Sequence, residues 1–152
     1  AVAQCVDEAI YLLGLDRSAQ PVHFRNLCGM EHGVRADGQR LLQVFINLLG
    51  NARAASAPDG EIRIECRARG HETLITVTDE GCGIPAAQLE QVFEPFFTTK
   101  APGEGTGLGL SLCYSIVRDM EGSITIQSPA DPATGRGTRV LISLPRADMA
   151  LE

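Results

Sequence analysis

Two asparagines, Asn47 and Asn51, stand four residues apart in an otherwise apolar stretch of this 152-residue chain. Residues at that spacing lie on one face of a helix. Carboxamide oxygens are hard, neutral ligands that suit Mg²⁺, which completes its coordination with water and substrate phosphates. Because the pattern Asn-x-x-x-Asn also occurs along ordinary polar helix edges, the pair alone leaves both interpretations open.

A second group of residues, Asp79-Glu80-Gly81-Cys82-Gly83-Ile84-Pro85, follows an apolar stretch that predicts a strand. A carboxylate on the last strand residue can accept a hydrogen bond from an exocyclic amine. The glycines let the backbone approach a flat ring closely. The alternative is an ordinary turn, since Asp and Gly are also common turn formers.

The third group is a ladder of four alternating glycines, Gly103 to Gly109, that leads directly into a predicted helix. Glycines free the backbone to point N–H groups inward, and the N-terminus of a helix attracts phosphate. The stretch matches neither the P-loop pattern nor the dinucleotide-binding pattern. A flexible linker is the alternative, but helical periodicity resumes at once after it.

The elements that must position these groups can be read from periodicity and turn residues. Apolar residues at helical spacing predict a helix from about Val2 to Leu15. A second helix is predicted from a cap at Asp37 to about Ala55. A third helix from about Leu108 to Met120 is expected to close with Gly122 as its C-terminal cap. Strands are predicted at 21–25, 62–67, 74–78, 123–127 and 138–144, with a turn at Gly70-His71 between the second and third.

Composition limits the possibilities further. The length suits one domain, and 44% hydrophobic with 21% charged residues is typical of a globular protein. The net charge of −6 disfavours a nucleic-acid face, and no apolar run approaches a membrane span. A single lysine, Lys100, stands among the 13 basic residues. The five cysteines are odd in number and never spaced C-x-x-C, which predicts neither a zinc site nor a disulfide framework and favours a reducing compartment.

The order of these motifs resembles the ATP-binding domain of sensor histidine kinases. The paired asparagines correspond to that family's N box, and Asp79-x-Gly-x-Gly corresponds to its G1 box. Phe93-Glu94-Pro95-Phe96-Phe97-Thr98-Thr99-Lys100 resembles the F box, and the glycine ladder resembles the G2 box. Gly137-Thr138 resembles the G3 element, so the likeness extends from about Val2 to Pro145. The F-box sequence is most similar to the nitrogen-regulation and oxygen-sensor subgroup.

The resemblance implies an α+β fold, the two-layer Bergerat sandwich, with a mixed and mostly antiparallel sheet, helices on one face and an ATP lid. Asn51 would coordinate Mg²⁺, and Asn47 and Lys100 would act at the phosphates. Asp79 would accept the adenine amino group, supported by Thr138 through water, with the ring between Gly81, Gly83 and Ile84. The other implied nucleotide-binding residues lie in the lid and at the start of the third helix: Thr98, Thr99, Gly105, Thr106, Gly107, Leu108, Gly109 and Leu110.

By the same resemblance, residues 1–147 would form a catalytic domain that binds MgATP, and 148–152 a tail whose Leu151-Glu152 is typical of a cloning remnant. Its γ-phosphoryl group would pass to a histidine on a dimerisation and phospho-acceptor domain outside this chain. A response regulator would act downstream. The isolated domain is expected to be cytoplasmic and monomeric, without autophosphorylation, nucleic-acid binding or membrane contact. A GHKL-type ATPase and a non-catalytic nucleotide-binding module remain alternatives.

Departures from the family pattern sharpen these alternatives. Asn47 stands where the family's ATPases carry a glutamate that activates water, which favours phosphotransfer over hydrolysis. Many relatives carry a basic residue where this chain has Ala54, and Arg53 is expected to face elsewhere on the helix. His23, His32 and His71 lie in a predicted strand, loop and turn, so none is expected to accept phosphate.

Overall fold

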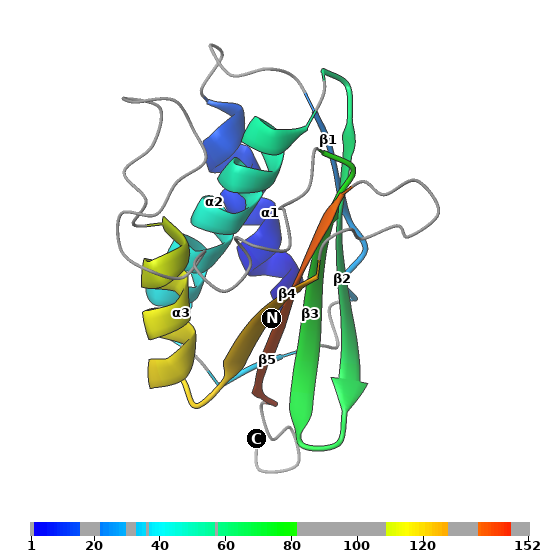
Figure 1. Cartoon of the computed structure of the whole chain (residues 1–152). Coiled ribbons are helices and arrows are strands. Elements are labelled where there is room, and N and C mark those ends of the chain that lie inside the picture. The colour runs from blue at the N-terminus through cyan, green and yellow to red at the C-terminus, as the bar shows by residue number, and fades with distance from the viewer. Residues whose placement is uncertain are drawn as a thin grey trace.

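A five-stranded sheet carries its helices on one face (Figure 1). The computed structural model describes residues 2–15, 22–29, 33–35, 37–56, 58–81, 109–127 and 137–146. Within those ranges the helices are α1 (Val2–Gly14), α2 (Gly38–Ala55) and α3 (Gly109–Asp119), and the strands are β1 (His23–Asn26), β2 (Glu61–Arg69), β3 (Glu72–Asp79), β4 (Ser123–Gln127) and β5 (Thr138–Pro145). No helix in the same ranges is long and apolar enough to cross a membrane.

The strands follow the spatial order β1-β2-β3-β5-β4. The β1–β2 pair is parallel and the other three pairs are antiparallel. The β2–β3 hairpin turns at Gly70, whose φ of 61° is a left-handed conformation that glycine adopts without strain. The pairing of Asp79 with Thr138 brings the end of β3 to the start of β5. The predicted α+β sandwich, with a mixed and mostly antiparallel sheet, is therefore confirmed.

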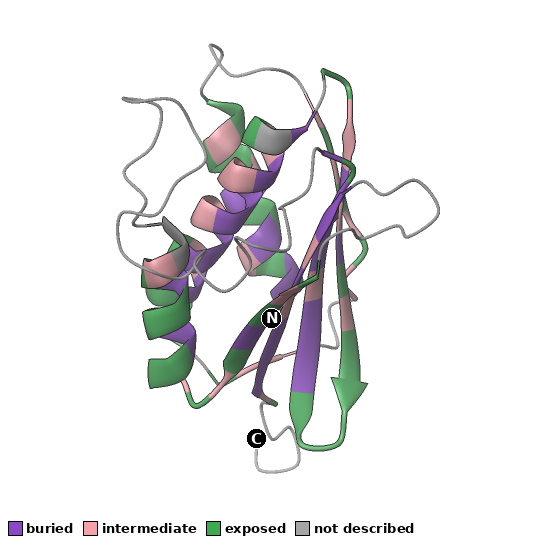
Figure 2. Ribbon diagram, in the orientation of Figure 1, coloured by how far each residue is buried: buried purple, intermediate pink, exposed green. Residues whose placement is uncertain are grey.

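The apolar core lies between the helices and the sheet face that they cover (Figure 2). Along β2, Ile62 and Ile64 are fully buried, whereas the alternating Arg63 and Glu65 belong to the opposite face. The predicted apolar stripe of α2 is buried around Phe45 and Leu49, both without exposed surface. The largest fully buried apolar side chains from the other elements are Val2, Val6, Ile75, Val117, Ile142 and Leu144.

The start of α2 is determined by its N-cap. The Asp37 carboxylate accepts hydrogen bonds from the backbone N–H groups of Gln39, at 2.9 Å, and Arg40, at 3.4 Å. These bonds satisfy two of the donors that the first turn of a helix leaves unpaired. The predicted cap is confirmed, and α2 runs to Ala55 as expected. The other elements begin and end close to their predicted bounds.

The end of α3 differs from the prediction. Gly122 was expected to take the left-handed capping position, but Glu121 does so, with a φ of 63°. The Gly122 N–H donates to the Val117 carbonyl at 2.9 Å and the Glu121 N–H donates to the Arg118 carbonyl at 3.0 Å, which is the Schellman arrangement. Gly122 is instead needed for close packing, because a Cβ atom there would lie 2.3 Å from the Ser143 carbonyl oxygen.

The cysteines also depart from expectation, because Cys28 and Cys66 form a disulfide, with Cα atoms 4.9 Å apart. The β1–β2 pairing explains the contact. Asn26 pairs with Ile64, and the Leu27 N–H continues the ladder by donating to the Ile64 carbonyl at 2.8 Å. Two further residues along each parallel strand therefore lie opposite one another, at the usual spacing of neighbouring strands. The prediction of no disulfide is wrong at this pair, since spacing along the chain does not reveal strand register.

Candidate nucleotide-binding site

Asp79 occupies the last position of β3, on the sheet face that meets the helices, and is 7% exposed. Its Oδ1 accepts a hydrogen bond from the Gly81 N–H at 2.9 Å. The Thr138 N–H is a second backbone donor to this carboxylate. Burial raises the pKa of Asp79, and the two N–H groups partly oppose that rise. The carboxylate is thus buried, oriented by the backbone and held at one end of the sheet.

Two glycines, Gly81 and Gly137, connect the backbone segments beside Asp79. The Gly137 N–H donates to the Gly81 carbonyl at 2.9 Å, which joins the segment after β3 to the segment before β5. Gly137 has a φ of 90°, a conformation in which a side chain is disfavoured. Both glycines are buried, as is the neighbouring Thr138. The structure therefore brings together three sequence-predicted residues: Asp79, Gly81 and Thr138.

The two predicted asparagines lie one turn apart on α2, and both are half-buried. Asn47 is hydrogen-bonded to the thiol of Cys113, which belongs to α3. The same thiol donates to the Val44 carbonyl at 3.7 Å, and Cys113 has no exposed surface. Burial raises the pKa of the Cys113 thiol to about 12. Cys113 therefore stays protonated and links the two helices beside Asn47.

Sequence reasoning did not identify Cys113 as a neighbour of Asn47. A lone cysteine on an apolar helical stripe has no distinguishing signal, and its partner depends on how α2 packs against α3. Arg53 faces α1, as the expectation that it points elsewhere on the helix requires: its Nη1 donates to the Leu13 carbonyl at 2.8 Å, at the end of α1. This guanidinium therefore serves the α1–α2 contact.

The helix α3 begins at Gly109, as the glycine ladder predicts, so Gly109 and Leu110 supply its first backbone groups. Figure 1 shows the start of α3, the C-terminal half of α2 and the end of β3 directed toward the same end of the molecule. The remaining predicted nucleotide-binding residues lie outside the described residues: Gly83, Ile84, Thr98, Thr99, Lys100, Gly105, Thr106, Gly107 and Leu108. Their roles stay predictions.

The described part of the site fits an adenine nucleotide. A carboxylate offers about four lone-pair positions, and the N–H groups of Gly81 and Thr138 use only part of that capacity. Asp79 can therefore also accept an amino group. The carboxamides of Asn47 and Asn51 are oxygen donors of the type that Mg²⁺ prefers. These residues provide suitable groups for both the base and the metal.

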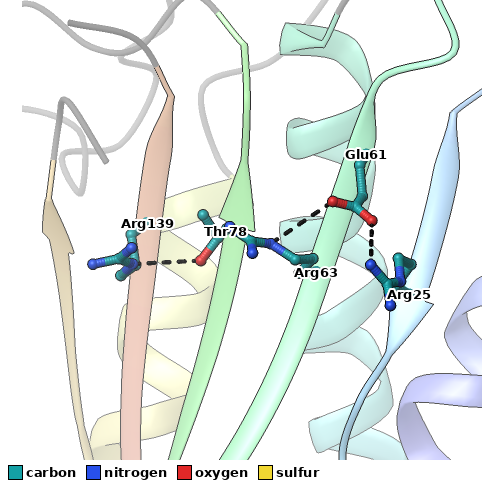
Figure 3. Close-up of polar contacts among 5 residues, drawn as sticks. All are labelled: Arg25, Glu61, Arg63, Thr78 and Arg139. Carbon is teal, nitrogen blue, oxygen red and sulfur yellow. Dashed lines mark hydrogen bonds and ion pairs between the residues drawn. The ribbon is translucent and has the colours of Figure 1, made fainter. Parts of the chain in front are cut away.

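The opposite face of the sheet has a different character (Figure 3). Arg25 contacts Glu61 at 2.8 Å, and the Arg139 Nε donates to the Thr78 hydroxyl at 3.4 Å. A hollow of about 310 Å³ lies here, lined by residues of β2, β3 and β5 that include Arg67 and Arg139. Because side chains alternate along β3, this hollow and the Asp79 carboxylate lie on opposite faces. The hollow is therefore separate from the candidate nucleotide site.

Comparisons with known proteins agree with this geometry. The family model described as histidine kinase-, DNA gyrase B- and HSP90-like ATPase matches residues 36–148. The sensor histidine kinase ZraS of Escherichia coli O157:H7 is 44% identical over 112 residues, which cover 74% of this chain and 23% of ZraS. The first three curated relatives are matched over only 13–17% of their own length. This chain thus corresponds to a small part of those proteins.

Solved structures show the same relationship. A mycobacterial sensor histidine kinase, MprB, is 28% identical with a TM-score of 0.86, and 97% of each chain is covered. The catalytic domain of the histidine kinase ThkA is 31% identical with a TM-score of 0.79, over 94% of this chain and 91% of that domain. The agreement extends over nearly the whole chain in both cases. The chain therefore belongs to the histidine kinase-, DNA gyrase B- and HSP90-like ATPase family and, within it, is a catalytic domain of a sensor histidine kinase.

Proposed function

We propose that this chain binds MgATP and transfers the γ-phosphoryl group to a histidine on a dimerisation and phospho-acceptor domain of a longer protein. The buried, backbone-oriented carboxylate of Asp79 is the observation that carries this proposal, because it suits an adenine amino group. In the transfer, a histidine ring nitrogen bonds to the γ-phosphorus as the bond from phosphorus to the ADP oxygen breaks. Catalysis then rests mainly on positioning and charge stabilisation.

Each remaining role follows the family pattern. Asn47 and Lys100 act at the phosphates, and Gly105, Gly107, Leu108 and Gly109 offer backbone N–H groups to them. Gly83 and Ile84 shape the slot for the base, and Thr98, Thr99, Thr106 and Leu110 are further nucleotide-binding residues. Asn51 would hold Mg²⁺, which would supply neutralisation of the phosphate charge. Thr138 supports Asp79 through a water as well as through its backbone.

The proposal also covers the cellular location, oligomeric state and downstream partner of this domain. Residues 1–147 are the catalytic unit, located in the cytoplasm, monomeric when isolated and without direct membrane contact or nucleic-acid binding. A response regulator receives the phosphoryl group downstream. The F-box sequence from Phe93 to Lys100 supports assignment to the nitrogen-regulation and oxygen-sensor subgroup.

A mixing experiment with γ-labelled ATP tests this function. We expect negligible hydrolysis by the isolated chain, because Asn47 is not a general base for water. Label should appear on the helical phospho-acceptor domain of the same parent protein when the two are combined. The matched control replaces the acceptor histidine by glutamine. Rapid release of phosphate by the chain alone would instead support an ATPase, and binding without either reaction would support a regulatory nucleotide-binding module.

The metal assignment is tested by Asn51→Ala. We expect ATP affinity in Mg²⁺ to fall by roughly 10-fold or more, in line with a lost metal ligand, while affinity in excess EDTA changes little. Isothermal titration calorimetry under the two conditions measures both values. Gln43→Ala is the control, since Gln43 is an exposed carboxamide two turns earlier on α2. Equal losses with and without the metal would remove Asn51 from the coordination shell.

A further inference from the structure

The first helix and first strand, the α1–β1 unit, are linked to each other by side-chain hydrogen bonds, and α1 contributes Val2 and Val6 to the core. The family match begins at residue 36, after α1 and β1. Among the described strands, β1 is a four-residue edge strand that pairs with β2 alone. The Asn26 Nδ2 ties it to α1 by donating to the Ala3 carbonyl at 3.0 Å and to the Asp7 carboxylate at 2.8 Å. A short, singly paired edge strand is the kind of element that opens locally before the whole domain unfolds.

The Cys28–Cys66 disulfide lies where this unit meets the rest of the sheet. Cys28 lies two residues after the end of β1, and Cys66 lies in the middle of β2. Both residues are half-buried, so small thiol reagents can reach them with only local opening. The bridge is therefore a covalent fastening between the α1–β1 unit and the remainder of the domain.

The other described cysteines are poorly suited to thiol exchange. The thiolate is the reacting form, and burial raises the pKa of Cys5 to about 11 and that of Cys113 to about 12. Cys113 is also fully buried on α3. Among the described cysteines, the pair at 28 and 66 thus combines access with a partner in bonding position.

We propose that Cys28 and Cys66 form a redox modification site whose reversible disulfide fastens the α1–β1 unit to the sheet. Glutathione disulfide serves as the oxidant. One cysteine thiolate attacks it, breaking its S–S bond and releasing one glutathione, and the second cysteine displaces the other glutathione to form the Cys28–Cys66 bond. The two protons of the cysteine thiols pass to the two glutathione thiolates that are released, which leave as thiols. The protein pair is oxidised by two electrons, and the glutathione disulfide is reduced.

The consequence extends to α2, because α1 packs against it. Arg53 donates to the Leu13 carbonyl at 2.8 Å, and the Leu13 side chain lies beside Gly50. A disulfide that restrains α1 and β1 therefore also restrains the turn of α2 between Asn47 and Asn51. A compartment that keeps thiols reduced would keep Cys28 and Cys66 as two thiols, and oxidising conditions would form the disulfide between them.

The test uses the whole chain in glutathione buffers of increasing oxidised fraction, with no nucleotide present, so failure of the kinase proposal cannot affect it. Alkylation followed by peptide mass spectrometry should show a Cys28–Cys66 link that disappears with dithiothreitol. Oxidation should raise the melting temperature by on the order of 10 °C and slow hydrogen exchange in residues 2–28. Cys28→Ser and Cys66→Ser should abolish both shifts, whereas Cys5→Ser should retain them.

Any of three outcomes would overturn the proposal. In the first, both cysteines remain open to alkylation at every glutathione ratio. In the second, each is capped separately by glutathione and no peptide joins them. A link that forms without slowing exchange in α1 and β1 would also overturn it, because the fastening role would then be absent. The alkylation readout does not depend on variants, so it stands even if a serine substitution weakens folding.

Discussion

Asp79→Asn is expected to lose ATP binding by roughly 100-fold or more while the domain stays folded, which corresponds to about 3 kcal/mol. The asparagine oxygen can still accept from the Gly81 N–H, so the local backbone keeps its anchor. The other carboxylate oxygen becomes an NH₂ group, and a donor would then face the amino group of adenine. The substitution also removes the negative charge that strengthens such a hydrogen bond.

Isothermal titration calorimetry with ATP and ADP measures this loss, and thermal unfolding checks the fold. Glu80→Gln is the matched control, because it makes the same chemical change at the adjacent, exposed carboxylate. We expect the control to bind as the wild type does. If Asp79→Asn bound ATP with unchanged affinity, Asp79 would not be the adenine acceptor, and the proposed orientation of the nucleotide would have to be abandoned.

Gly122→Ala is expected to destabilise the domain by about 3 kcal/mol or more, through overpacking against groups that cannot move easily. The new Cβ would lie 2.3 Å from the Ser143 carbonyl oxygen and 2.6 Å from the Leu144 side chain. Both neighbours belong to β5, which is paired on both sides by β3 and β4. Relief would require α3 or β5 to shift.

Urea denaturation followed by circular dichroism measures this change. The control is Gly38→Ala, in the first turn of α2, where an added Cβ meets nothing within 4 Å. That control should change stability by no more than about 1 kcal/mol, and in the favourable direction, because alanine suits helices better than glycine. Equal stability of the two variants would show that β5 and α3 accommodate a methyl group, contrary to the geometry.

The sequence predicted those features that depend on local rules. The Asp37 cap, the apolar stripe around Phe45 and the turn at Gly70 each rest on a few neighbouring residues, and each is confirmed. The position of Asp79 at the end of its strand follows in the same way from alternation along β3. The resemblance of the motif order to that of sensor histidine kinases then supplied the fold.

Features that depend on pairing between distant elements were not predicted. The Cys28–Cys66 contact requires the register of β1 on β2, and the Asn47–Cys113 contact requires the packing of α2 on α3. The end of α3 also depends on distant contacts, because Glu121 takes the left-handed conformation and Gly122 packs against β5. Capping rules point to glycine for the left-handed position, but the proximity of β5 makes the smaller residue necessary one position later. Tertiary contact overrides local preference at each of these places.

The hydrogen bond between Gly81 and Gly137 bears on how this domain tolerates changes of length. This bond and the Asp79–Thr138 pairing hold together the two chain positions that border residues 82–136, a span that includes α3 and the sheet strand β4. For a flexible loop, doubling the length adds only about 0.6 kcal/mol of closure entropy. An insertion outside α3 and β4 that behaves as such a loop can therefore accumulate during evolution without displacing the Asp79 carboxylate.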